Sequence, residues 1–249
     1  MTNIINGKRI NQIITFLNSL KIRSKRFSDI INSQNVSVIQ DFNQALTHSS
    51  NNKIINYEKL EFFGDAVLRL AASNFIEKKY PQMSVGERSE LRAQIVSDEW
   101  LTKLGQKIQI EKVIIKGPKA HGDNNSYNTI IAEATEALIG ALYKCFNSIQ
   151  EVNIWLDDIW EVDSEILLQA PYKFKAKSLL QEWCQNKGYD LPVYKITEVS
   201  KKNGDPKRFS CDLLIKGSIE SSAFGKSRKQ AEKNAARVLI EKFINIGKI

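Results

Sequence analysis

Two groups of acidic residues have a spacing that would place their carboxylates side by side. Glu58, Glu61 and Asp65 follow one another at intervals of three and four within an otherwise apolar run. Glu133 and Glu136 are three residues apart in a second apolar run. Residues three or four apart share one face of a helix. Carboxylates on an apolar face repel one another and are costly to desolvate. The pattern therefore indicates that a cation neutralises them.

Mg²⁺ is the cation that such clusters of oxygen ligands suit, because it takes one or two carboxylates together with waters and substrate phosphates. A magnesium ion held in this way can generate a hydroxide nucleophile and stabilise the leaving oxygen in phosphodiester hydrolysis. Arg69, one turn beyond Asp65, neutralises only part of the charge. Two ordinary helices with solvated acidic faces are the alternative, and the apolar surroundings of the acids favour the metal site.

The elements that carry these acids are predicted to be helices, and no strand is expected before residue 160. The expected helices cover residues 8–40, 57–72, 87–106 and 129–147. The pattern changes after Pro171, where a further helix, three strand-like stretches and a last helix follow. These five elements are expected at residues 173–187, 193–199, 208–215, 217–225 and 227–244.

The fold class that follows is an all-α domain followed by a small α+β domain of order α-β-β-β-α. We place the all-α domain at residues 1–160, a linker at residues 161–171 and the α+β domain at residues 172–246.

Charge separates the two predicted domains. The 249 residues are 42% apolar and 26% charged, with a net charge of +8. Residues 172–249 contain 17 Lys and Arg against 8 Asp and Glu, whereas the rest of the chain contains 19 against 20. This asymmetry indicates a polyanion-binding second domain. Lys226, Arg228 and Lys229 flank Ser227, an expected N-cap, where helix N–H groups and the helix dipole favour phosphate.

Several classes of protein are excluded or disfavoured. The apolar stretches are far shorter than the roughly 20 residues of a membrane span. The first residues lack the order of a secretory signal, and the three cysteines are widely spaced without a CxxC motif. We therefore expect a cytoplasmic protein without a membrane partner. His48, beside Ser49 and Ser50, is expected to pack a loop rather than to act in a nucleophilic triad.

Two runs of residues resemble a known family. NYEKLEFFGDAVL at 56–68 resembles the signature helix of the ribonuclease III family, and IIAEATEALIGALY at 130–143 resembles that family's second acidic helix. ALTHSS at 45–50 and the loop around 116–118 fall where the family has similar segments. The last domain is similar to a double-stranded RNA-binding domain.

An activity follows from this resemblance as an expectation. It implies a homodimeric, Mg²⁺-dependent endoribonuclease, with Mn²⁺ as a substitute, that cleaves double-stranded RNA. The implied products are staggered, with 5′-phosphate and 3′-hydroxyl ends, and the implied role is the processing of ribosomal and messenger RNA precursors.

Roles for single residues also follow from the resemblance. The implied metal ligands are Glu61, Asp65, Glu133 and Glu136. Asp65 and Glu136 match the positions regarded as catalytic, and Glu58 matches a supporting acid. The positions implied for the RNA minor grooves are Ser178, Gln181, Glu182, Lys207 and Arg208, in addition to the phosphate-binding Lys226, Arg228 and Lys229.

Three positions depart from the family pattern. Glu133 stands where the family usually has Asp, so its carboxylate reaches one methylene further. Val85 stands where an auxiliary Glu near the metal is usual, and the loop before Lys207 lacks a common His. A non-cleaving double-stranded RNA-binding protein with a weakened metal site is therefore an alternative. A phosphohydrolase of small nucleotides is a third reading, but it leaves the basic domain without a purpose.

Overall fold

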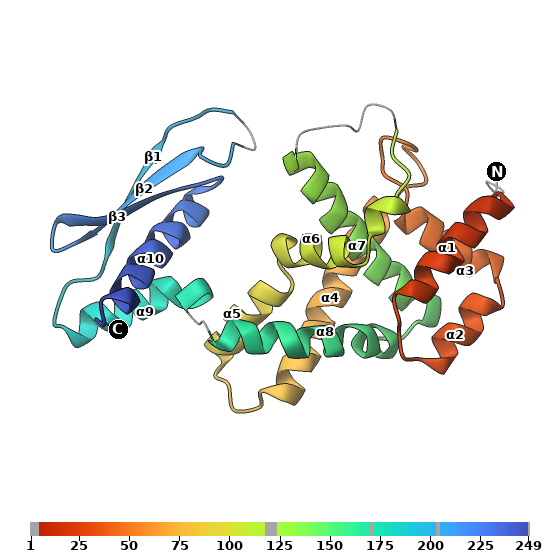
Figure 1. Ribbon diagram of the computed structural model, residues 1–249, viewed down its shortest axis with the longest axis horizontal. Coiled ribbons are helices and arrows are strands. Elements are labelled where there is room, and N and C mark those ends of the chain that lie inside the picture. Colours follow the sequence, from red (N-terminus) through yellow and green to blue (C-terminus); the bar gives the residue numbers. More distant parts are fainter. Residues whose placement is uncertain (1–4, 118–123, 170–171, 203–204, 249) are drawn as a thin grey trace. The chain divides into compact units, whose positions relative to one another are not determined.

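The protein is described by a computed structural model over residues 5–117, 124–169, 172–202 and 205–248. The chain divides into two compact units, Met1–Ser164 and Glu165–Ile249, and each is described by itself (Figure 1). Within the described ranges, no helix has the length and apolar character needed to cross a membrane.

Helices build the first unit, as the sequence predicts. They are α1 (Gly7–Ser19), α2 (Lys25–Asn32), α3 (Val36–Ala45), α4 (Glu58–Lys79), α5 (Val85–Ile95), α6 (Asp98–Lys107), the 3₁₀ turn η1 (Ile110–Lys112), α7 (Asn124–Phe146) and α8 (Gln150–Gln169), of which residues 150–164 belong to this unit. In the part of this unit that the structure describes, β-type pairing is limited to one bridge between Thr47 and Ile115.

Two stretches that the sequence predicts as continuous helices are interrupted. Residues 8–40 contain three helices, because Ser24 and Asn35 each accept a hydrogen bond from the backbone N–H three residues later and begin α2 and α3. Ser97 divides residues 87–106 in the same way and begins α6. An N-cap residue leaves the helical backbone conformation, so each of these side chains marks the start of a new helix. The preceding helices α1 and α2 end earlier, before Lys21 and Gln34, whose backbones have positive φ.

The stretch expected as a linker, residues 161–171, is largely helical in the structure. Residues 161–169 form the end of α8, and residues 170–171 lie outside the described ranges. The start of this stretch packs on the first unit: Asp163 accepts a hydrogen bond from the Trp100 indole at 2.7 Å, and Ser164 shares one with the Tyr80 hydroxyl at 2.8 Å. These tertiary contacts stabilise the end of α8, although its acidic composition is typical of a solvent-exposed linker.

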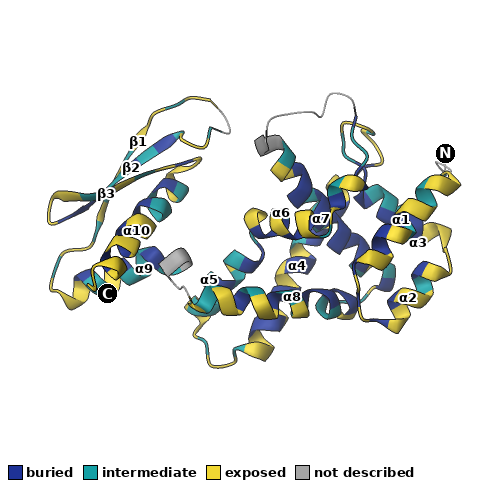
Figure 2. Cartoon of the chain, in the orientation of Figure 1, coloured by how far each residue is buried: buried dark blue, intermediate teal, exposed yellow. Residues whose placement is uncertain are grey.

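The two acidic helices cross at glycines. A Cβ atom added at Gly64 of α4 would lie 2.0 Å from the Glu136 carbonyl oxygen, and one added at Gly140 of α7 would lie 2.4 Å from the Leu60 carbonyl oxygen. No larger residue fits between the two backbones at either point. Figure 2 shows α7 as buried along much of its length, and its residues Ile131, Leu138 and Ile139 are at most 1% exposed.

The second unit confirms the predicted α-β-β-β-α order. Its elements are α9 (Tyr172–Asn186), β1 (Val193–Glu198), β2 (Phe209–Ile215), β3 (Ser218–Gly225) and α10 (Arg228–Asn245). The strands form an antiparallel sheet in the order β1-β2-β3, and the two helices lie on one face of it (Figure 1). The core between them includes Leu180, Leu213, Ala235 and Leu239. Part of the turn predicted before β2, residues 203–204, lies outside the described ranges.

We predict that Gly64→Ala lowers the free energy of unfolding by about 1–3 kcal/mol, because the added methyl group meets the backbone of α7 and forces the helices apart. Gly86→Ala is the matched control, since its Cβ would meet nothing closer than 4.0 Å and alanine is the better helix former. Thermal melting of both variants measures the difference. Equal melting temperatures would show that α4 and α7 do not cross this closely.

Candidate functional site

The crossing of α4 and α7 brings the predicted acids together. Glu61 and Asp65 of α4 lie on either side of Gly64, and Glu136 of α7 supplies the carbonyl that touches this glycine. All three side chains are half-buried, as is that of Glu133, whereas Glu58 at the start of α4 is exposed. The tertiary structure therefore joins the two sequence motifs into one acidic site.

Repulsion and burial perturb two of these acids strongly. Burial raises the pKa of Glu136 to about 8, and the negative charges of Asp65 and Glu61 add to the effect. Burial likewise raises the pKa of Glu61 to about 7, together with the charges of Glu133 and Glu58. A group of carboxylates whose pKa values rise in this way lacks sufficient positive charge of its own. Such perturbation is characteristic of functional sites.

Arg69 supplies part of the missing charge. Its Nε donates to both carboxylate oxygens of Asp65 at 2.9 Å, and its Nη2 approaches Oδ1 at the same distance. The arginine side chain is 55% exposed, so this pair is partly screened by solvent. The positive charge of Arg69 lowers the pKa of Glu136, but this effect is smaller than the burial and the negative charges that raise it. The charge of Glu136 is therefore not neutralised by Arg69.

Sequence reasoning did not identify two further residues of the site. The Tyr57 hydroxyl donates a 2.6 Å hydrogen bond to Glu133 Oε2, and the carboxylate of Asp98, at the start of α6, also raises the pKa of Glu136. Tyr57 directly precedes the acidic motif, and this position is the only feature of the sequence that places it near the site. Asp98 carried no such signal, because only the fold brings α6 to α7.

The acids fit a hard divalent cation by their ligand chemistry. They offer oxygen ligands only, and their mutual repulsion decreases when a cation binds. Among the described residues, no three His, Cys, Asp or Glu side chains are close enough together to hold a metal ion by themselves. Mg²⁺ does not require such a group, because it keeps several waters and substrate oxygens among its ligands.

Val85 lies away from these acids in its own chain. It is the first residue of α5 and is 85% exposed. Helix α5 packs on the second half of α4, where Arg92 donates to Ser73 and Arg88 pairs with Glu77. A rise of 1.5 Å per residue separates Asp65 from Glu77 by about 18 Å along α4. An acid at position 85 would therefore lie near the end of α4, not beside the acids of the same chain.

The cations of the second unit gather from two segments. The Lys207 ammonium lies 5.7 Å from the ring of Phe224, and the guanidinium groups of Arg208 and Arg228 both lie over the ring of Phe209. Arg208 also pairs with Glu198. The start of α10 and the residues before β2 therefore form one basic surface. The sequence could not show this, because the two segments are separated along the chain.

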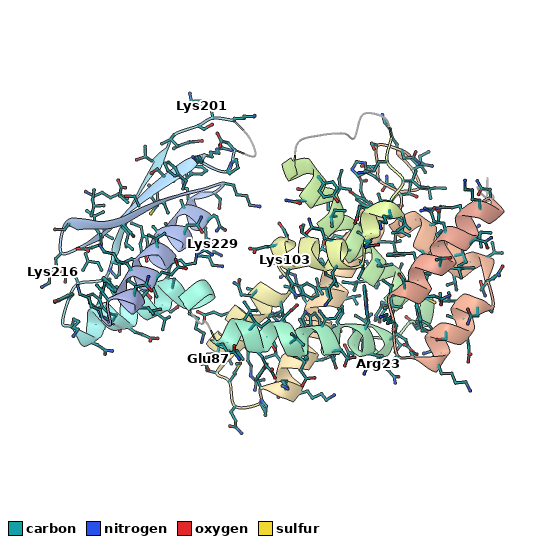
Figure 3. All side chains as sticks on the ribbon, viewed as in Figure 1. Arg23, Glu87, Lys103, Lys201, Lys216 and Lys229 are labelled. Carbon is teal, nitrogen blue, oxygen red and sulfur yellow. The ribbon has the colours of Figure 1, made fainter. Side chains whose placement is uncertain are left out.

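The start of α10 keeps the geometry that the sequence predicts. The Ser227 hydroxyl accepts a hydrogen bond from the Gln230 N–H, and Lys226, Arg228 and Lys229 are exposed around it. Figure 3 shows Lys229 and Lys216 on opposite sides of the second unit. An exposed cluster of this kind at a helix N-terminus is suited to bind phosphate.

The predicted positions on α9 form a separate group. Gln181 and Glu182 are exposed and Ser178 is half-buried. Helix α9 is joined to α10 by an ion pair between Lys177 and Glu232, with 2.7 Å between Nζ and Oε2. The structure thus places these polar side chains on the neighbouring helix, apart from the basic surface around Phe209.

Comparison with known proteins extends this picture. Residues 40–152 match the family described as Ribonuclease-III-like, and residues 176–243 match the double-stranded RNA binding motif. A protein of Prochlorococcus marinus named Ribonuclease 3 is 44% identical over 245 residues, which are 98% of this chain and 98% of that protein. A protein of Nostoc sp. named Ribonuclease 3 2 is 35% identical and covers 78% of this chain, with 80% of its own length aligned.

Similarity also extends to solved structures. The nuclease domain of ribonuclease III from Campylobacter jejuni is 25% identical and has a TM-score of 0.43. The match covers 67% of this chain and 99% of that one.

We predict that the metal-free protein loses stability as the pH rises from about 5 to about 8. Glu61 and Glu136 have raised pKa values in the folded state, so the folded protein binds more protons than the unfolded chain in this interval, and folding is favoured at the lower pH. Melting temperatures in a chelator should fall less steeply for Glu136→Gln than for the parent. The exposed Glu241 provides a control, Glu241→Gln, that should follow the parent. Parallel curves for all three proteins would contradict the assigned repulsion.

Proposed function

This chain belongs to the ribonuclease III family of double-stranded RNA endonucleases, and on that premise we propose an Mg²⁺-dependent enzyme that makes staggered cuts. The proposed products carry 5′-phosphate and 3′-hydroxyl ends, and Mn²⁺ is the proposed substitute metal. Structured ribosomal and messenger RNA precursors in the cytoplasm are the proposed substrates.

The observation that carries the proposal is the acidic site at the crossing of α4 and α7. Glu61, Asp65, Glu133 and Glu136 are the residues that would hold the metal. Mg²⁺ bound there would supply a hydroxide nucleophile and stabilise the leaving oxygen of the phosphodiester. The raised pKa values of Glu61 and Glu136 support this assignment, because these carboxylates are unbalanced by protein cations.

The chain's own residues orient this chemistry. Asp65 and Glu136 are proposed as the catalytic acids, with Arg69 holding Asp65 in a fixed position through two hydrogen bonds. Glu58 is proposed as a supporting acid, since its charge contributes to the raised pKa of Glu61. Without a cation these carboxylates would repel the scissile phosphate, so substrate binding at the site is linked to the metal.

RNA binding is assigned mainly to the second unit. We propose that cleavage resides in residues 1–160 and duplex binding in residues 172–246, joined by residues 161–171. Proteins grip duplex RNA by its shape, through phosphates and 2′-hydroxyl groups across successive minor grooves. The proposed minor-groove contacts are Ser178, Gln181, Glu182, Lys207 and Arg208, and the proposed phosphate contacts are Lys226, Arg228 and Lys229.

A homodimer through the first unit is also part of the proposal. Phe62 of α4 is 85% exposed and Ile54 is 86% exposed. Ile54 and the exposed Phe63 of α4 line a hollow of about 590 Å³, together with Gln44, Ile55, Lys59, Leu60 and Lys144. An exposed aromatic side chain and an apolar hollow on the same surface suit a two-fold interface, in which each copy covers the other's apolar residues.

We predict that Glu136→Gln reduces duplex cleavage at least about a hundredfold, because it removes a charged metal ligand. Duplex binding should stay within about twofold of the parent, since most affinity comes from phosphate contacts elsewhere. Cleavage of a long RNA duplex with and without Mg²⁺ and a binding titration in chelator measure the two effects, with Glu241→Gln as the control. Absence of cleavage by the parent at every Mg²⁺ concentration would instead support the non-cleaving RNA-binding alternative.

We predict that Lys226→Ala/Arg228→Ala/Lys229→Ala weakens duplex binding and flattens its salt dependence. Each lost phosphate contact lowers the slope of log affinity against log salt by about one, because fewer counterions are released. The matched control, Lys187→Ala/Lys216→Ala/Lys242→Ala, removes the same charge from exposed lysines away from the start of α10. Binding titrations at several salt concentrations compare the two. Equal slopes for both triple variants would rule out a specific phosphate site at the start of α10.

A further inference from the structure

The hydroxyl of Tyr57 donates a short hydrogen bond to one acid of the site. Tyr57 precedes α4, is 1% exposed and donates to Oε2 of Glu133 at 2.6 Å. The two residues are 76 positions apart in the sequence. A tyrosine hydroxyl is protonated at neutral pH, so it acts as a donor to this carboxylate. A short hydrogen bond to a charged acceptor is among the stronger kinds.

The segment before α4 holds the tyrosine ring in place. The Tyr57 N–H donates to the Thr47 carbonyl at 2.9 Å, and the His48 ring packs edge-on against the phenol with 5.4 Å between the ring centroids. His48 is itself fixed, because its Nδ1 lies 2.6 Å from Ser50 Oγ and its backbone N–H donates to the Ile115 carbonyl at 2.9 Å. The ALTHSS segment thereby gains a role as the frame of this tyrosine.

The length of the acidic side chain is matched to this frame. An aspartate at position 133 would withdraw the carboxylate by about one C–C bond, roughly 1.5 Å. The distance between the Tyr57 hydroxyl and the carboxylate, now 2.6 Å, would then exceed the range of an O–H···O hydrogen bond, which ends near 3.0 Å. A glutamate can therefore use the Tyr57 hydroxyl at this position, whereas an aspartate cannot without a shift of α7.

We propose that Tyr57 is a positioning residue, which holds one oxygen of the Glu133 carboxylate so that the other is presented to the metal. The inference rests on the proposed function and deepens it. Hydrogen-bond partners behind a ligand orient it and restrict its motion, and their loss typically weakens metal binding. The glutamate at position 133 and the tyrosine at position 57 then form one matched pair.

The test compares Tyr57→Phe, Glu133→Asp and the double variant with the parent. Phenylalanine keeps the ring and its contact with His48, so only the hydroxyl is lost. The control is Tyr80→Phe, which removes a hydroxyl that shares a 2.8 Å hydrogen bond with Ser164 in the same unit. The readouts are the Mg²⁺ concentration for half-maximal cleavage and, without RNA, the calorimetric titration of each protein with Mn²⁺.

Tyr57→Phe should need about tenfold more Mg²⁺ and bind Mn²⁺ about tenfold more weakly, with cleavage recovering at high Mg²⁺. Tyr80→Phe should titrate like the parent. In the Glu133→Asp background the same tyrosine change should have little effect, because an aspartate cannot reach the hydroxyl.

The proposal is overturned if Tyr57→Phe and the parent have the same metal titrations, or if the tyrosine change costs as much metal affinity in the Glu133→Asp background as in the parent. A loss of metal affinity of the same size in Tyr80→Phe would also overturn the proposal, because it would attribute the effect of Tyr57→Phe to a general loss of stability. A parent that does not cleave RNA contradicts the proposed function separately, since the Mn²⁺ titration still decides whether Tyr57 positions the acid.

Discussion

The close contact between the backbones of α4 and α7 is the constraint on which the first unit depends. Gly64 and Gly140 remove the side chains that would otherwise separate the helices, and each would place a Cβ within 2.4 Å of a carbonyl oxygen on the other helix. Because the glycines lie among the acids, the same contact that packs the core also gathers the carboxylates. Core packing and acidic site therefore cannot be changed independently at this crossing.

The gathered carboxylates make the site electrostatically unfavourable without a cation. Arg69 holds Asp65 and the Tyr57 hydroxyl holds Glu133, but neither side chain balances Glu61 or Glu136. The first unit thus contains repulsion between carboxylates that a bound divalent ion would relieve, a pattern typical of sites at which function opposes stability. In the proposed role of Tyr57, a neutral donor would orient an acid while leaving its charge available for the metal.

The two units differ in the sign and the placement of their charge. The first unit concentrates negative charge at a small half-buried site, whereas the second unit carries all the positive excess of the chain, mostly on exposed side chains. A polyanionic duplex would be repelled by the acids alone, so affinity from a separate basic unit suits an acidic metal site. Two segments of the chain build the basic surface around Phe209 and Phe224, which would supply part of that affinity.

The sequence by itself determined the helical first domain, the α-β-β-β-α second domain and the spacing that aligns Glu61 with Asp65, because periodicity and spacing act locally. It did not reveal the breaks at Ser24, Asn35 and Ser97 or the helical end of α8, where caps and tertiary packing prevailed over periodicity. Only the tertiary structure decided that Tyr57 meets Glu133, that Asp98 approaches Glu136 and that Val85 lies apart. These contacts join segments far apart in the chain, and they depend on how close two backbones can approach rather than on any local pattern.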